Sequence, residues 1–248
     1  MRAIAVCALA LLLGAAVEAG TQSRAEAPRD GTVAVRGTDG RVRVVGWSRG
    51  EVSATSSDSH EDVKVRVVRE GGTTSVRAHG RGGVVVRVPA GSRVVVKTRG
   101  GDIVVEGVTG ALDLESTSGD FHVAGSPRMV SVESLSGDVD VAGSTETLRV
   151  KTVSGSVLVP RARGFVEASS VSGDVQVTGR GLRRATLRST SGRAVFAGTL
   201  PRDGSLHLES ISGIVELRVP AGIAADFDLS SLGGGQIESA LGPRPTRQ

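Results

Sequence analysis

Two stretches of this sequence decide its fold: STSGDFHV at Ser116–Val123 and SLSGDVDV at Ser134–Val141. Both follow one order of residues, with hydroxyl side chains first, then Gly and Asp, then two apolar residues separated by a polar one. Apolar residues at every second position lie on one face of a β-strand. Each stretch therefore predicts a turn that leads into a short, half-buried strand.

The same motif, a hydroxyl residue followed three positions later by Gly, recurs along the chain. The hydroxyl residues are Thr98, Ser116, Ser134, Thr152, Ser170, Ser189, Ser210 and Ser231. The corner glycines are Gly101, Gly119, Gly137, Gly155, Gly173, Gly192 and Gly213, with Gly234 in the last copy. The spacing is constant from Thr98 to Ser170 and lengthens slightly in the copies that follow. A constant period of this length indicates a repeat architecture.

A second pair of alternating apolar residues precedes each hydroxyl residue, as Val130 and Val132 precede Ser134. Each unit thus contains two short strands and two turns. The few apolar side chains of one unit cannot offset the entropy of ordering its backbone, so neighbouring units must supply further burial and the strand hydrogen bonds. We therefore predict an all-β, single-domain parallel β-solenoid with two-strand coils of about 18 residues.

An antiparallel meander is the alternative architecture with the same period. Identical corner chemistry in every unit argues against it, because a meander alternates unlike turns. The corner glycines are expected to adopt positive φ, which Gly does without penalty. The hydroxyl residues share the parity of the buried residues, and we expect them to bond turn carbonyls or amides at the edge of the core.

The N-terminus has the features of a secretory signal peptide over residues 1–19. Arg2 gives a positive start, Ala3–Val17 is apolar, and Val17–Ala19 fits the small-x-small cleavage pattern. Cys7 lies inside this segment, so the processed chain would have no cysteine, no disulfide, no thiol catalysis and no cysteine zinc site. No later segment is apolar enough to predict a transmembrane span.

The rest of the chain divides by its pattern. Residues 20–31 form a polar leader, and residues 32–93 contain less regular strands that we expect to form an N-terminal β cap. Residues 94–240 hold the solenoid repeats, and residues 241–248, with two prolines, form a tail predicted to be disordered.

The composition disfavours several kinds of partner. Aromatic residues make up 2% of the chain, whereas single-strand nucleic-acid binders need aromatic platforms for base stacking and sugar-binding clefts tend to use Trp and Tyr. The net charge of +4 is spread along the chain and is typical of a solvated surface. We therefore expect no nucleic-acid partner.

Three sets of residues are candidates for chemical sites. Gly46–Gly50 matches the G-x-S-x-G nucleophile elbow, but the following residues alternate like a strand, where the elbow needs a helix, and a hairpin turn is favoured. Asp58, His60, Glu61 and Asp62 cluster without the spacing of a zinc site, which favours a solvated loop. The remaining histidines, His79, His122 and His207, are scattered singly. We predict no catalytic residue and no cofactor.

Two charged sets complete the candidates. Asp102, Asp120, Asp138 and Asp174 follow corner glycines and would stack in a column that calcium could bridge, but Ser156 interrupts it and the calcium-binding nonapeptide is missing. The favoured interpretation is hydrated turn residues with no metal. Five arginines form the densest basic stretch and could contact anionic polymers or lipid head groups, although a solvated face is favoured; they are Arg180, Arg183, Arg184, Arg188 and Arg193.

The Ser-Gly-Asp-Val-x-Val units, as at Ser136–Val141, resemble those of the bacterial putative-adhesin family, a family of domains of unknown function with a β-solenoid fold. Arg43–Trp47 resembles that family's start, and Val88–Gly91, echoed by Val219–Gly222, resembles the segment before its repeats. The resemblance covers roughly residues 32–240. It implies an exported envelope or surface protein and carries no catalytic residues.

These observations favour a non-enzymatic, adhesin-like interaction or scaffold protein in the periplasm or at the cell surface, with an envelope or surface partner of unknown identity. An accessory or sensing role in an envelope-stress system is the alternative. A polysaccharide-active β-helix enzyme is disfavoured, because such sites cluster carboxylates and basic groups in a groove, whereas these acidic residues recur singly at corners.

Overall fold

The computed structural model describes residues 22–37, 39–57, 63–80 and 82–220, and every regular element in these ranges is a β-strand. The strands are β1 (Gln22–Glu26), β2 (Thr32–Arg36), β3 (Val42–Trp47), β4 (Glu51–Ser56), β5 (Lys64–Glu70), β6 (Thr73–His79), β7 (Val84–Pro89), β8 (Arg93–Thr98), β9 (Ile103–Glu106), β10 (Ala111–Ser118), β11 (Phe121–Ala124), β12 (Met129–Ser136), β13 (Val139–Val141), β14 (Thr147–Ser154), β15 (Val157–Ser172), β16 (Val175–Ser189), β17 (Ala194–Thr199), β18 (Ser205–Ser210) and β19 (Val215–Arg218).

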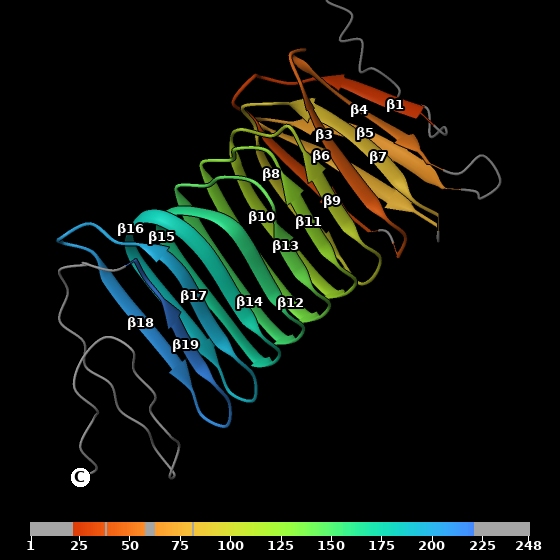
Figure 1. The fold of residues 1–248 in the computed structure, drawn as a ribbon. Coiled ribbons are helices and arrows are strands. Elements are labelled where there is room, and N and C mark those ends of the chain that lie inside the picture. Colours follow the sequence, from red (N-terminus) through yellow and green to blue (C-terminus); the bar gives the residue numbers. More distant parts are fainter. Residues whose placement is uncertain (1–21, 38, 58–62, 81, 221–248) are drawn as a thin grey trace, which may run out of the picture.

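Two parallel ladders form the body of the protein (Figure 1). The first contains β8, β10, β12, β14, the second parts of β15 and β16, and β18. The second contains β9, β11, β13, the first parts of β15 and β16, β17 and β19. Leu112 lies opposite Val94 on one side and Val130 on the other, so the partners of a residue are its equivalents in the neighbouring repeats. These parallel pairings confirm the predicted β-solenoid and exclude the meander.

The core lies between the two ladders and is built from the alternating apolar residues that the sequence predicts. Phe121 and Phe196 are its largest fully buried side chains, and Val139 and Val141 are buried while Asp140 between them lies outside. The predicted parity is therefore confirmed. Burial weakens in the last coil, where the inward residue Val215 is 45% exposed, because among the described residues no strand covers the far side of β18 and β19.

The N-terminal coils do not stack in chain order. β2 pairs with both β6 and β8, and β3 pairs with both β7 and β9, all in parallel. The β2–β3 coil therefore lies between the β6–β7 and β8–β9 coils, although it precedes both in the sequence. The region expected to be an irregular cap thus contains two further parallel coils.

Three antiparallel strands close this end of the stack (Figure 1). β5 pairs with the edge of β6, β4 pairs with the edge of β7, and β1 pairs with β4. An uncovered strand edge presents unpaired backbone groups to other chains. Here β5 covers the outer edge of β6 and β4 covers that of β7, so the β6–β7 coil at the end of the stack has no uncovered edge. β1 lies within the stretch expected to be a polar leader.

The corner glycines lie against the backbone of the preceding coil. A Cβ atom on Gly137 would be 2.1 Å from the carbonyl oxygen of Gly119, and one on Gly213 would be 1.9 Å from that of Gly192. Gly119 and Gly137 have φ of +108° and +126°, as expected, but Gly173, Gly192 and Gly213 are not in the positive-φ region. Positive φ therefore explains the earlier corners only, and the close approach of the preceding coil is the reason that all the corners share.

The opposite corner has a second glycine column, which the sequence analysis missed. A Cβ atom on Gly143 would be 2.0 Å from the carbonyl oxygen of Gly125, and one on Gly46 would be 2.1 Å from that of Gly107. The signal was present in the sequence as a glycine two positions after an inward apolar residue, as in Val105–Gly107.

Candidate interaction surfaces

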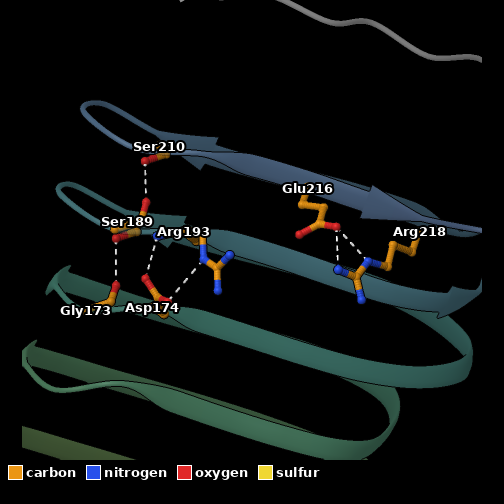
Figure 2. A network of polar contacts seen from close by, with 8 residues as sticks. Gly173, Asp174, Ser189, Arg193, Ser210, Glu216 and Arg218 are labelled. Atoms are coloured by element: carbon orange, nitrogen blue, oxygen red, sulfur yellow. Dashed lines mark hydrogen bonds and ion pairs between the residues drawn. The ribbon is translucent and has the colours of Figure 1, made fainter. Parts of the chain in front are cut away.

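The Asp that follows a corner glycine links its coil to the next one. In each case the Oδ1 atom accepts a hydrogen bond from a backbone amide one coil further along. The pairs are Asp102 with the amide of Asp120 at 3.3 Å, Asp120 with that of Asp138 at 2.9 Å, Asp138 with that of Ser156 at 2.7 Å and Asp174 with that of Arg193 at 2.8 Å. Figure 2 shows the last of these pairs. The carboxylates expected to be hydrated turn residues thus form a hydrogen-bond ladder between coils, which we call the Asp ladder.

Arginines flank this Asp ladder. Arg41 pairs with Asp102 at 2.8 Å, and Arg193 pairs with Asp174 at 3.4 Å. The hydrogen bond from Arg41 is the largest cause that lowers the pKa of Asp102, and the amide of Asp120 adds to it. Within the described ranges no three His, Cys, Asp or Glu side chains are grouped to hold a metal ion. The geometry assigns the column to hydrogen bonding.

The hydroxyl residues bond turn carbonyls in two ways. Ser116 donates to the carbonyl of Ser118 in its own turn at 2.8 Å, whereas Ser189 donates to the carbonyl of Gly173 in the preceding coil at 2.8 Å (Figure 2). Thr152 lies between the coils that use these two modes, and its buried Oγ1 has no hydrogen-bond partner. The expected bonds to turn carbonyls are therefore present, with Thr152 as an exception.

A row of exposed aliphatic side chains follows the outside of the same corner. Its members stand between the two hydroxyl residues of the motif, and the hydroxyl residues that precede them are paired in register from coil to coil. They are Leu135, Val153, Val171 and Ile211, which are 54%, 42%, 45% and 68% exposed. Thr190 continues the row between Val171 and Ile211. We call these four apolar residues the aliphatic row.

The elbow-like segment Gly46–Gly50 has a structural role. β3 ends at Trp47 and β4 follows it, where the nucleophile elbow requires a helix. The Trp47 Nε1 group donates to the carbonyl of Glu51 at 2.8 Å, and the Arg49 guanidinium lies 5.2 Å from the centre of the Trp47 ring. The expected hairpin is wrong, because β7 lies between β3 and β4 and pairs with both.

The other polar candidates do not come together. The cluster of Asp58, His60, Glu61 and Asp62 lies outside the described residues. His122 lies 3.1 Å from Asp140, His207 lies 3.4 Å from Glu209, and His79 lies opposite Lys64 in β5. Each histidine is thus on a different strand pair, and none lies in a shared site.

The basic stretch of five arginines is divided by the fold. Arg188 pairs with Glu209 at 3.0 Å on the outer face of the first ladder, and Arg193 belongs to the glycine corner. Arg180, Arg183 and Arg184 stay together at the opposite corner and are exposed. The five arginines therefore do not form one surface, and all of them are exposed, as in the favoured interpretation of a solvated face.

Over the ranges that the structure describes, no helix has the length and apolarity needed to cross a membrane.

Solved structures from several bacteria are similar to this chain. A putative adhesin from Bacteroides fragilis is 12% identical, with a TM-score of 0.46 over 79% of this chain and 95% of that one. A putative lipid-binding protein and a putative adhesin, both from Parabacteroides distasonis, are 12% and 13% identical, with TM-scores of 0.43 and 0.41 over 79% of this chain and 96% of each. No curated protein sequence matches the chain. Residues 29–237 match the Toastrack DUF4097 family, and because this match spans most of the sequence, the chain belongs to that family.

Proposed function

We propose that this protein is exported and acts, without catalysis, as an adhesin-like interaction or scaffold protein at the cell envelope. The observation that carries the proposal is the aliphatic row. Nine large hydrophobic side chains are exposed on the described surface, and Leu135, Val153, Val171 and Ile211 stand at one equivalent position of the repeat. Single exposed apolar residues need no explanation, whereas an aligned set marks a contact surface.

The solenoid suits such a surface because it fixes both spacing and direction. Neighbouring strands are about 4.8 Å apart, so each coil adds one side chain to the row at a constant interval. The corner backbone is held by the glycine contacts and by the Asp ladder, which reduces the entropy lost on binding. The matching partner is an envelope or surface protein that presents a strip of apolar side chains.

The arrangement of carboxylates supports a role without catalysis. A glycan-cleaving site needs two carboxyl groups that face one substrate bond. Among the described residues, Asp102, Asp113 and Glu167 are each paired with an arginine, and the corner Asp side chains accept backbone hydrogen bonds. These side chains are already used to hold coils together.

Binding of envelope components by purified variants tests the proposal. The wild type is immobilised beside the row variant L135S/V153S/V171S/I211S and a control variant, M129S/L158S, which removes exposed side chains outside the row. We expect envelope proteins retained by the wild type and the control to be lost from the row variant. Equal retention by all three proteins would overturn the assignment of the row.

Export is tested by the intact mass of the processed protein. We expect the form isolated from the periplasm, cell surface or medium to lack residues 1–19. Recovery of a cytoplasmic protein that still begins at Met1 would contradict export.

A further inference from the structure

Four cationic side chains lie in one row on the outer face of the first ladder. Arg66 of β5 is opposite Arg77 of β6. Arg36 of β2 comes next, opposite Arg77 on one side and Lys97 of β8 on the other. All four side chains are exposed. With strands about 4.8 Å apart, the row places four positive charges along about 15 Å, and we call it the cationic row.

The row exists because the β2–β3 coil is inserted out of chain order. Arg36 precedes both Arg77 and Lys97 in the sequence, yet in the stack it lies between them. Lys97 is bonded to Glu115 of β10, where the row ends. Arg36, Arg66 and Arg77 form no ion pair with any other described residue.

This arrangement contrasts with the cation–anion pairs found further along the same face, although Glu115 also lies opposite a like charge, Glu133. Like charges directly opposite each other destabilise a strand pair, whereas opposite charges stabilise it. Further along the ladder, Arg93 pairs with Asp113 at 2.6 Å and Arg149 with Glu167 at 3.0 Å. The three arginines of the row face one another without paired anions, which costs stability, and an anionic ligand that lies along the row would offset that cost.

We propose that the cationic row binds a linear acidic polysaccharide that carries one carboxylate on each sugar. A sugar unit is close in length to the strand spacing, so a polysaccharide laid along the row can bring carboxylates to several of its cations. Guanidinium groups hold carboxylates through paired hydrogen bonds. The column beside the row holds Val68, Ser75, Ala34 and Val95, whose side chains are all shorter than arginine and leave the arginine heads accessible.

The same face disfavours the other anionic partners. None of the exposed large hydrophobic side chains lies on β2, β5, β6 or β8, so the row has no apolar anchor for a membrane. These four strands carry no Phe, Tyr or Trp on which bases could stack. Recognition rests on charge, so a neutral polysaccharide should not bind. The inference is independent of the aliphatic row, which lies on a different surface.

The test is titration of the processed chain with polygalacturonate oligomers. The variant R36Q/R77Q removes two charges from the row, and the control R161Q/R163Q removes two exposed charges from β15. We expect R36Q/R77Q to bind at least about tenfold more weakly than the wild type, because it loses two charge-assisted contacts that contribute to the binding free energy. The control should bind like the wild type. Affinity should fall as salt is raised. No binding by the wild type, or equal losses in both variants, would overturn the proposal.

Three further ligands separate the possible sources of negative charge. Dextran should not bind, and vesicles of phosphatidylcholine with phosphatidylglycerol and linear polyphosphate should bind more weakly than polygalacturonate. Tighter binding to the vesicles or to polyphosphate would overturn the assignment to an acidic polysaccharide.

Thermal melting shows whether weaker binding reflects unfolding. R36Q/R77Q should melt no lower than the wild type, because it removes repulsion between facing charges. The single variant R66Q, at the end of the row, gives a second measure and should bind several-fold more weakly while remaining folded. Full affinity in a folded R66Q and a folded R36Q/R77Q would overturn the proposal.

Discussion

The Oδ1 atom of Asp138 accepts a hydrogen bond of 2.7 Å from the backbone amide of Ser156, which occupies the equivalent position one coil later. Asp120 makes the same bond to the amide of Asp138 at 2.9 Å. Each of these carboxylates therefore acts on the coil that follows its own. In a solenoid, where stability is roughly a sum over coils and their interfaces, such bonds stabilise every interface at which they occur.

Removing the Asp138 acceptor should weaken one interface. We expect Asp138→Ala to lower the free energy of unfolding by about 1 kcal/mol, because the amide of Ser156 loses its partner. Asp138→Asn keeps an oxygen in place and should cost less. Urea unfolding of both variants measures the difference, and equal losses would show that charge, rather than the acceptor atom, matters.

Calcium should not stabilise the fold. One oxygen of each Asp in the ladder already accepts a hydrogen bond from a backbone amide. The carboxylates at the two ends of the ladder, those of Asp102 and Asp174, are each paired with an arginine. Thermal melts with a chelator and with millimolar calcium should therefore coincide. A clear rise of the melting temperature with calcium would assign the column of Asp102, Asp120 and Asp138 to a metal.

Gly137→Ala should be strongly destabilising. Its Cβ atom would lie 2.1 Å from the carbonyl oxygen of Gly119, which is backbone and cannot move without shifting the coil. We expect a loss of more than about 2 kcal/mol in the free energy of unfolding. Gly72→Ala is the control, since a Cβ atom there meets nothing within 4 Å, and it should change stability by less than about 0.5 kcal/mol. Similar losses in both variants would contradict the steric explanation.

Thr152→Val should leave stability unchanged or raise it by up to about 1 kcal/mol. The buried hydroxyl has no partner, and valine has the same shape without the polar atom. Ser189→Ala should instead cost about 1 kcal/mol, because its hydroxyl donates to the carbonyl of Gly173 at 2.8 Å. If chemical denaturation shows equal losses, the Thr152 hydroxyl has a partner in solution.

Excision of Gly119–Ser136 should leave a folded, shorter protein. The cut removes one whole coil and joins Ser118 to Gly137, which restores the Ser-Gly corner and brings β10 beside β14 in register. Deletion of Gly119–Pro127, half of that coil, removes β11 and joins β10 directly to β12, a strand of the same ladder, and should unfold the protein. Circular dichroism and melting of both deletions check this, and the opposite order of stability would contradict the coil as the unit of folding.

The sequence by itself determined the coil and its register. Period-two alternation and the spacing of the corner motif are local properties, so Phe121 and Val141 could be placed inside and Asp140 outside without a structure. The family resemblance could also be read from the repeat, and the match over residues 29–237 confirms it. The signal peptide remains a prediction, because residues 1–19 lie outside the described residues.

Only the tertiary structure decided which coils are neighbours. The strands Thr32–Arg36 and Thr73–His79 have similar alternating patterns, and nothing local says which of them should lie against Arg93–Thr98. That choice depends on how whole coils stack, and it alone brings Arg36 between Arg77 and Lys97. The Asp ladder and the reason for the corner glycines could not be predicted from the sequence for the same reason. The atoms that Asp138 and Gly137 contact belong to other coils and become neighbours only when the coils stack.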